Sequence, residues 1–189
     1  MNVNPPPLLP NAPPFRHLPA GVAIPLARAE RKICKRSREE LYAFDIRGNE
    51  VLYVPGQHPR EIELSDEAAA LCRDRIVTHN HPNHGGSFSI VDLEFAIKND
   101  VREFRAVDGV RWQFVYSLHR PDGGWPEGFF EEVYDEYRRT LPAVEARHQR
   151  EVEQGSMSKE DSLYELLHET WERVKGVLGL DYRRIPWSD

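Results

Sequence analysis

The residues best suited to do chemistry are two histidines, a serine and an aspartate in one short stretch of the chain. His79 and His81 are two positions apart, Ser89 comes eight positions after His81, and Asp92 comes three positions later. The β-branched, apolar run 75–78 before them predicts a short buried strand. Side chains two apart on a strand point to one face, so both imidazoles are expected on the same side of the sheet. Two histidines and one aspartate leave the fourth position of a tetrahedral zinc open to water, as in catalytic zinc sites.

The residues after His81 predict how Asp92 reaches the histidines. Pro82 cannot donate to a strand ladder, so the strand should end there. Gly85 and Gly86 allow the chain to bend sharply. Residues 89–92 then open a helix, which puts Asp92 in the first turn, where its carboxylate can point back at the imidazoles.

These residues resemble the signature of a known family. The spacing His79-x-His81, seven residues, Ser89, two residues, Asp92 matches that of the JAMM (MPN+) zinc metalloproteases at every position. The residues around it, HNHP at 79–82 and SFS at 87–89, resemble the RadC-like branch and its relatives in phage and mobile-element proteins. The resemblance covers roughly Glu30 to Leu118 and implies zinc held by His79, His81 and Asp92.

The resemblance also implies catalytic roles. Ser89 would donate a hydrogen bond to the oxyanion, and a glutamate at the start of an early strand would act as general base. Glu39 and Glu40 both precede the expected strand 41–45, and alternation puts them on opposite faces, so only one can face the metal. A related pattern, with the glutamate six residues before a strand-ending aspartate, favours Glu39 and keeps Glu40 as the alternative base. Glu50 and Glu63 are more distant alternatives that read as surface charges.

Each of these residues also has an ordinary structural interpretation. Ser89 and Asp92 form Ser-x-x-Asp, which alone is a helix cap. His79 and His81 could be polar residues at the end of a strand. Because all four hold the family spacing together, a metal site is the favoured interpretation.

Length, charge and cysteine content set limits on the class of protein. The chain has 189 residues, enough for one domain with extensions, and 25 Lys+Arg against 31 Asp+Glu give a net charge of −6. Nucleic acid is therefore not expected as a main partner. Cys34 and Cys72 form no paired motif, which favours a reducing, cytoplasmic location. No apolar run approaches the length of a membrane span, so no membrane association is expected.

The pattern of elements predicts an α/β (α+β) protein in three parts. Residues 1–25 are proline-rich and predict a tail or linker, or else a strap across the surface. Residues 26–120 predict a metal-binding domain with a mixed sheet of about five strands flanked by helices. Its expected strands are 39–47, 51–54, 75–78, 101–107 and 111–118, with a further short strand at 61–64. The family resemblance implies the cytidine-deaminase-like JAB/MPN fold for this part.

Helices are expected on either side of this domain. Residues 26–36 predict a helix whose outer face is basic. Residues 127–189 predict a helical extension, with helices at 129–141 and 143–153 separated by Pro142, and a third helix that begins near Ser158 and stops at Gly179. The extension is expected to pack as a hairpin, and a protein-binding arm is the alternative.

Three functions follow from these patterns. The first is a zinc-dependent hydrolase that cleaves a peptide or isopeptide bond, its partner being a protein or peptide, such as a ubiquitin-like tail or its own precursor. The second is a non-catalytic JAB-fold module that binds protein in an assembly. The third is a DNA-associated mobile-element or defence protein of RadC-like type, for which the basic residues of 28–38 are the one physical argument. The sequence does not fix the substrate or the oligomeric state.

Overall fold

The computed structural model describes residues 11–82, 86–111 and 113–188. Its secondary structure is, in chain order, η1 (Pro13–Phe15), α1 (Ala20–Ile33), β1 (Leu41–Phe44), β2 (Glu50–Val54), α2 (Asp66–Ala70), β3 (Ile76–His81), α3 (Ile90–Lys98), β4 (Glu103–Asp108), β5 (Phe114–His119), α4 (Phe129–Glu153), α5 (Lys159–Leu178) and β6 (Asp181–Pro186). Within these ranges no helix has the length and apolar character needed to cross a membrane.

The strands form one mixed sheet in the order β2-β1-β3-β4-β5-β6. Only β3 and β4 run parallel, since α3 connects them as a crossover, and the other neighbours are antiparallel. The α/β class and the mixed sheet with flanking helices are therefore confirmed. Among the described residues, 26–120 supplies five of the strands, as expected, and β6 adds a sixth from outside that range.

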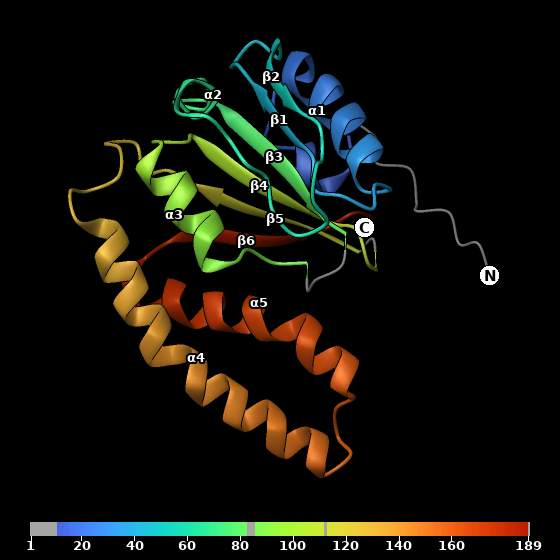
Figure 1. Ribbon diagram of the computed structural model, residues 1–189, viewed down its shortest axis with the longest axis vertical. Coiled ribbons are helices and arrows are strands. Elements are labelled where there is room, and N and C mark those ends of the chain that lie inside the picture. Colours follow the sequence, from blue (N-terminus) through green and yellow to red (C-terminus); the bar gives the residue numbers. More distant parts are fainter. Residues whose placement is uncertain (1–10, 83–85, 112, 189) are drawn as a thin grey trace.

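Helices lie on both faces of the sheet (Figure 1). Each face has its own hydrophobic core. On one face α1 and η1 pack on Tyr42, Phe44 and Ile76. On the other, α3, α4 and α5 pack on the alternate positions, such as Ala43 and Val77. This alternation along β1 and β3 decides which side chains reach the α3 face.

The predicted order of elements from residue 41 to residue 119 is confirmed, but the segment 61–64 is not a strand. Ser65 accepts a hydrogen bond from Ala68 N at 3.3 Å and begins α2, as expected of an N-cap serine. The strand with the histidines ends at His81, directly before Pro82.

The C-terminal part differs from the prediction in two ways. The expected break at Pro142 is wrong, because α4 is continuous from Phe129 to Glu153 with that proline inside it. A proline removes one backbone donor and crowds one carbonyl, and the long contact of α4 with α5 outweighs that local cost. The chain also returns after Gly179 as β6, which completes the sheet beside β5, so the extension is not purely helical.

The N-terminal part is more ordered than a tail over the residues that the structure describes. The first long helix begins at Ala20 and not at Leu26, and Pro25 lies inside it. Phe15 is 1 % exposed and packs in the α1 core, below the Arg105 guanidinium. Residues 11–19 thus lie against the sheet as a strap, and residues 20–25 form the first part of α1. Leu8 and Leu9 lie outside the described residues.

Both cysteines are buried and free, on opposite faces of the sheet. Burial raises the pKa of each thiol, Cys34 and Cys72, to about 12. Neither thiol is therefore a nucleophile at neutral pH, as expected for packed cysteines.

Candidate metal centre

The C-terminal end of β3 presents both histidines on the face of the sheet that α3 covers. His79 and His81 are 2 % and 5 % exposed, and their Nε2 atoms lie 2.8 Å apart. His79 packs against two aromatic rings that also stack on each other, with Phe104 at 4.8 Å and Phe88 at 6.3 Å between centroids. The strand geometry and this packing fix the two imidazoles so that they converge on one point.

The helix cap of α3 brings the third side chain to that point. Ser89 is the N-cap, and Asp92 is the third residue of a capping box in which each side chain bonds the other residue's backbone N–H. Asp92 Oδ1 lies 3.4 Å from His79 Nε2, and Asp92 Oδ2 lies 3.4 Å from His81 Nε2. The cap and the possible metal ligand are thus the same carboxylate, so the two sequence interpretations are compatible.

The arrangement fits a small divalent cation. Ligand atoms about 2.0–2.1 Å from a tetrahedral zinc lie about 3.3 Å from one another, which is close to both Asp92–histidine separations. The two imidazole nitrogens are about 0.5 Å closer than that, at hydrogen-bond distance. A cation would replace the proton that they share. His79, His81 and Asp92 therefore form a possible metal-binding group.

The charge of the group also suits a cation. Burial alone would raise the pKa of Asp92, but the neighbouring His79 and His81 hold it well below its usual value. Burial lowers the pKa of His81, but Asp92 and Glu39 more than offset this and raise it. The site stabilises a carboxylate and attracts positive charge to the imidazoles.

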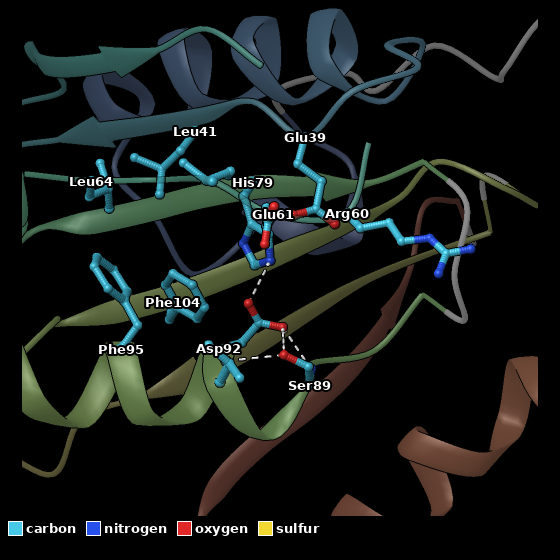
Figure 2. Close-up of a pocket in the computed structure, with 12 residues that line it drawn as sticks. Glu39, Leu41, Arg60, Glu61, Leu64, His79, Ser89, Asp92, Phe95 and Phe104 are labelled. Carbon is cyan, nitrogen blue, oxygen red and sulfur yellow. Dashed lines mark hydrogen bonds and ion pairs between the residues drawn. The ribbon is translucent and has the colours of Figure 1, made fainter. Parts of the chain in front are cut away.

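Glu39 lies on the same side as this group and Glu40 on the opposite side. Glu39 lines a cavity of about 410 Å³ together with His79, Ser89 and Asp92, and Figure 2 shows its side chain extending into that cavity. Glu39 is 7 % exposed, and its burial raises the pKa of its carboxyl against the opposing effect of the two histidines.

Glu40 is engaged in contacts away from the cavity. Its carboxylate accepts a hydrogen bond from Tyr53 Oη at 3.1 Å and lies 3.3 Å from Arg36 Nε. Glu50 and Glu63, the more distant alternatives, are exposed to solvent. Among the four glutamates that sequence reasoning considered, geometry therefore places only Glu39 beside the histidines and Asp92.

The cavity has an apolar end that the sequence did not predict. Leu41, Leu64, Phe95 and Phe104 gather there, beside His79 (Figure 2). Leu64 comes from the segment 61–64, which the sequence predicted as a strand and which instead runs as an irregular wall of the cavity. No motif marks such a wall, although its alternation of glutamate with leucine or isoleucine shows that one side of it is apolar.

Asn80 was also missed, and it supports the cavity from the opposite face of β3. Its Oδ1 accepts a hydrogen bond from Glu40 N at 2.7 Å, and its Nδ2 donates to Arg38 O at 3.1 Å. These bonds fix the backbone on either side of Glu39. The only available signal was an amide residue placed between two ligand histidines.

The basic residues of 28–38, in α1 and directly after it, are partly engaged within the fold. Lys32 Nζ donates to Tyr42 Oη at 2.6 Å and lies over the Tyr53 ring, and Arg36 pairs with Glu40. Two of the six cations of 28–38 are therefore occupied by aromatic and acidic neighbours. His84, in the loop after β3, lies outside the described residues.

Comparisons with protein-family models, with curated proteins and with solved structures find no match to this chain.

Proposed function

We propose that this protein is a zinc-dependent hydrolase of the JAMM type that cleaves a peptide or isopeptide bond, with a core of the JAB/MPN kind. The observation that carries the proposal is the convergence of His79, His81 and Asp92 on one point inside a cavity that Glu39 also lines. The mixed sheet, with a parallel pair joined through α3, is compatible with that fold.

His79 Nε2, His81 Nε2 and the Asp92 carboxylate would hold the metal. Asp92 Oδ1 faces His79, and Oδ2, which also accepts two hydrogen bonds from Ser89, faces His81. Zinc bound by three protein ligands supplies a Lewis acid that lowers the pKa of a water to about 7. Imidazole and carboxylate together suit zinc better than magnesium or calcium.

Glu39 acts in this proposal as the general base. A general base must lie within reach of the proton that it takes, and its pKa should be near the working pH. The buried position of Glu39 raises its pKa in that direction. Glu39 accepts the proton of the attacking water and passes it to the leaving amine, so that the amide bond breaks with no net change of charge on the protein.

Ser89 and the apolar end of the cavity have supporting roles. Ser89 Oγ lies at the N-terminal end of α3. The family resemblance gives it the role of donating a hydrogen bond to the developing oxyanion. Leu41, Leu64 and Phe95 offer an apolar surface to a substrate side chain next to the cleaved bond.

Metal content and hydrolysis measured together test the proposal. The full-length protein is freed of metal with a chelator, supplied with zinc at neutral pH and analysed for bound metal, beside His81→Ala and Asp92→Asn. Both variants are expected to lose one equivalent of zinc and all hydrolysis of panels of peptides and isopeptide-linked tails. Wild type that takes up zinc but cleaves nothing would favour a protein-binding module, and cleavage that persists in His81→Ala would overturn the metal-dependent mechanism.

A further inference from the structure

A second group of potential ligands lies on the opposite face of the sheet from the candidate metal centre. Glu103 begins β4 and His119 ends β5, and the two are register partners in the antiparallel pair. His17 reaches them from the segment between η1 and α1. Three parts of the chain that are far apart in sequence therefore bring two imidazoles and one carboxylate together.

The distances among these side chains are those of a ligand set. His17 Nε2 lies 3.3 Å from Glu103 Oε2, and His119 Nε2 lies 3.7 Å from Glu103 Oε1. One ligand atom from each residue can be chosen so that all three lie within 4.8 Å of one another. Donor atoms around a tetrahedral zinc are about 3.3 Å apart, so small side-chain rotations suffice to bring the set to that geometry.

The buried charge around Glu103 favours a cation at this place. Glu30 and Glu103 are 0 % and 2 % exposed, and both contact the single buried guanidinium of Arg105, at 2.6 and 2.5 Å. One positive charge between two buried carboxylates leaves negative charge in excess, and buried charge without compensation is costly. A divalent cation bound beside Glu103 supplies the compensation.

The two oxygens of Glu103 are used differently. Oε1 accepts hydrogen bonds from Arg105 and, at 2.9 Å, from Ser117 Oγ, which also lies 3.0 Å from His119 Nε2. Oε2 faces His17. In metal sites, hydrogen bonds from neighbouring groups commonly orient a ligating carboxylate. Here they hold one oxygen of Glu103 and leave the other toward His17.

The imidazoles leave access from solvent. The side chains of His17 and His119 are 29 % and 21 % exposed, while that of Glu103 is 3 % exposed. Their rings meet edge to face with centroids 5.4 Å apart. A cation can enter from the solvent side, and water can complete its coordination there.

We propose that His17, Glu103 and His119 form a second metal site, which binds a divalent transition cation of the zinc class. Imidazole with carboxylate selects zinc and its neighbours over magnesium or calcium. The site joins the strap before α1 to β4 and β5, so its metal stabilises the N-terminal segment on the sheet. The proposal does not depend on the hydrolase, since the two groups lie on opposite faces and share no residue.

Zinc stoichiometry of single and double variants tests this site. The full-length protein is stripped with a chelator, equilibrated with free zinc at neutral pH and analysed for bound metal. Wild type is expected to bind two equivalents, His17→Ala one, His81→Ala one, and the double variant none. His58→Ala is the matched control, because its imidazole is 52 % exposed and contacts only Arg60 N, at 3.3 Å, and Glu61, at 3.6 Å, among the described residues. Two equivalents are expected.

Thermal unfolding gives an independent measure, because a ligand that binds only the folded state raises the melting temperature. Zinc is expected to raise the melting temperature of His81→Ala, in which only the second site remains, and to leave that of His17→Ala/His81→Ala unchanged. A wild type that binds one equivalent, lost in His17→Ala, would contradict only the candidate metal centre. A His81→Ala variant that binds no zinc, or the same zinc content in His81→Ala and in His17→Ala/His81→Ala, would overturn the proposal. In that case His17 and Glu103 form an ion pair only.

Discussion

At the scale of single residues, two adjacent glutamates have different roles, one in the proposed catalysis and the other in the structure. Glu39 faces the cavity and Glu40 is bonded to Tyr53 and Arg36 on the other side. Glu39→Gln is expected to lower the rate of hydrolysis by about 10²–10⁴-fold, because a general base contributes that much. Zinc content should not change, since Glu39 is not a ligand. Single-turnover kinetics with metal analysis on the same sample measures both.

Glu40→Gln is the matched control, and it is expected to keep the rate within the same order of magnitude. The substitution is expected to lower the stability of the fold, because the ion pair with Arg36 is lost. The reverse result, a rate lost in Glu40→Gln and kept in Glu39→Gln, would show that the base reaches the site from the other face and that the assignment is wrong.

Ser89 offers a second residue-scale prediction, because its hydroxyl has two candidate roles. In the structure it donates to Asp92 Oδ2 at 2.8 Å and accepts from Asp92 N at 3.2 Å. Ser89→Ala is therefore expected to weaken zinc binding by about 10–100-fold, as loss of a ligand's outer partner does. The lost cap should also cost about 0.5–2 kcal/mol. Zinc competition with a chromophoric chelator and thermal unfolding measure the two effects.

Ser158→Ala is the control for Ser89→Ala. Ser158 caps α5 with the same Ser-x-x-Asp contacts to Asp161, at 2.6 and 2.9 Å, away from both histidines. It should lower stability and leave zinc affinity unchanged. If Ser89→Ala instead lowers the rate of hydrolysis at full zinc affinity, the hydroxyl acts on the oxyanion and not through Asp92.

The sequence was sufficient for the parts of the site that obey local rules. The spacing of His79 and His81 on a strand, and of Ser89 and Asp92 at a helix start, follows from two repeating geometries, so both pairs could be placed. It could not decide between Glu39 and Glu40 from alternation alone. Alternation separates adjacent residues, but which face meets the histidines depends on where α1 packs.

At the scale of elements, β3 carries the ligands on one face and their support on the other. Asn80 bonds the backbone before β1 through Glu40 N and Arg38 O. Asn80→Ala leaves a buried donor and acceptor unpaired, which is expected to cost about 1–3 kcal/mol. It should also displace Glu39 and lower the rate by about 10²-fold, since misplacement of about 1 Å can do so.

Zinc affinity separates a positioning role from a general loss of fold in Asn80→Ala. Folded protein with full zinc content and a reduced rate is the expected result. Asn49→Ala removes an exposed side-chain bond to Asp45 in the β1–β2 turn and serves as the control. An unchanged rate in Asn80→Ala would mean that Glu39 is held by other contacts.

Elements that depend on distant contacts were the ones that the sequence did not predict. Pro142 suggested a break because a proline costs a helix one bond, but α4 is supported along its length by α5. β6 is a short strand after a helix stop, and its pairing with β5 spans more than sixty positions of the chain. Local propensity carries no information about either contact.

At the scale of the whole molecule, the C-terminal elements hold the loop of the candidate metal centre. Trp171 Nε1 donates to Phe88 O at 2.7 Å, and Tyr182 Oη lies 2.8 Å from Ser87 Oγ. Residues 86–89 separate the two parts of the ligand set, so α5 and β6 stabilise the geometry of a site to which they give no ligand. The C-terminal part therefore belongs to the same structural unit as the sheet, although the sequence suggested an extension.

His168 makes this link sensitive to pH. Its Nδ1 lies 2.8 Å from Tyr182 Oη, so the neutral imidazole accepts from the residue that contacts Ser87. Burial, together with the smaller effects of Arg184 and Lys175 and against that of Glu169, lowers the pKa of His168 from 6.5 to about 4. Between those two values the unfolded chain binds the proton and the folded chain does not.

Stability is therefore expected to fall as the pH falls from about 6.5 to about 4. Below the folded pKa both states are protonated, so this group adds no further change. His168→Gln keeps a polar side chain without the titration, so its free energy of unfolding should depend less on pH within this window and match the wild-type dependence above pH 7. Urea unfolding at several pH values measures the difference between the two proteins. Parallel curves would mean that His168 is protonated in the folded state and that the link from α5 to Ser87 does not respond to pH.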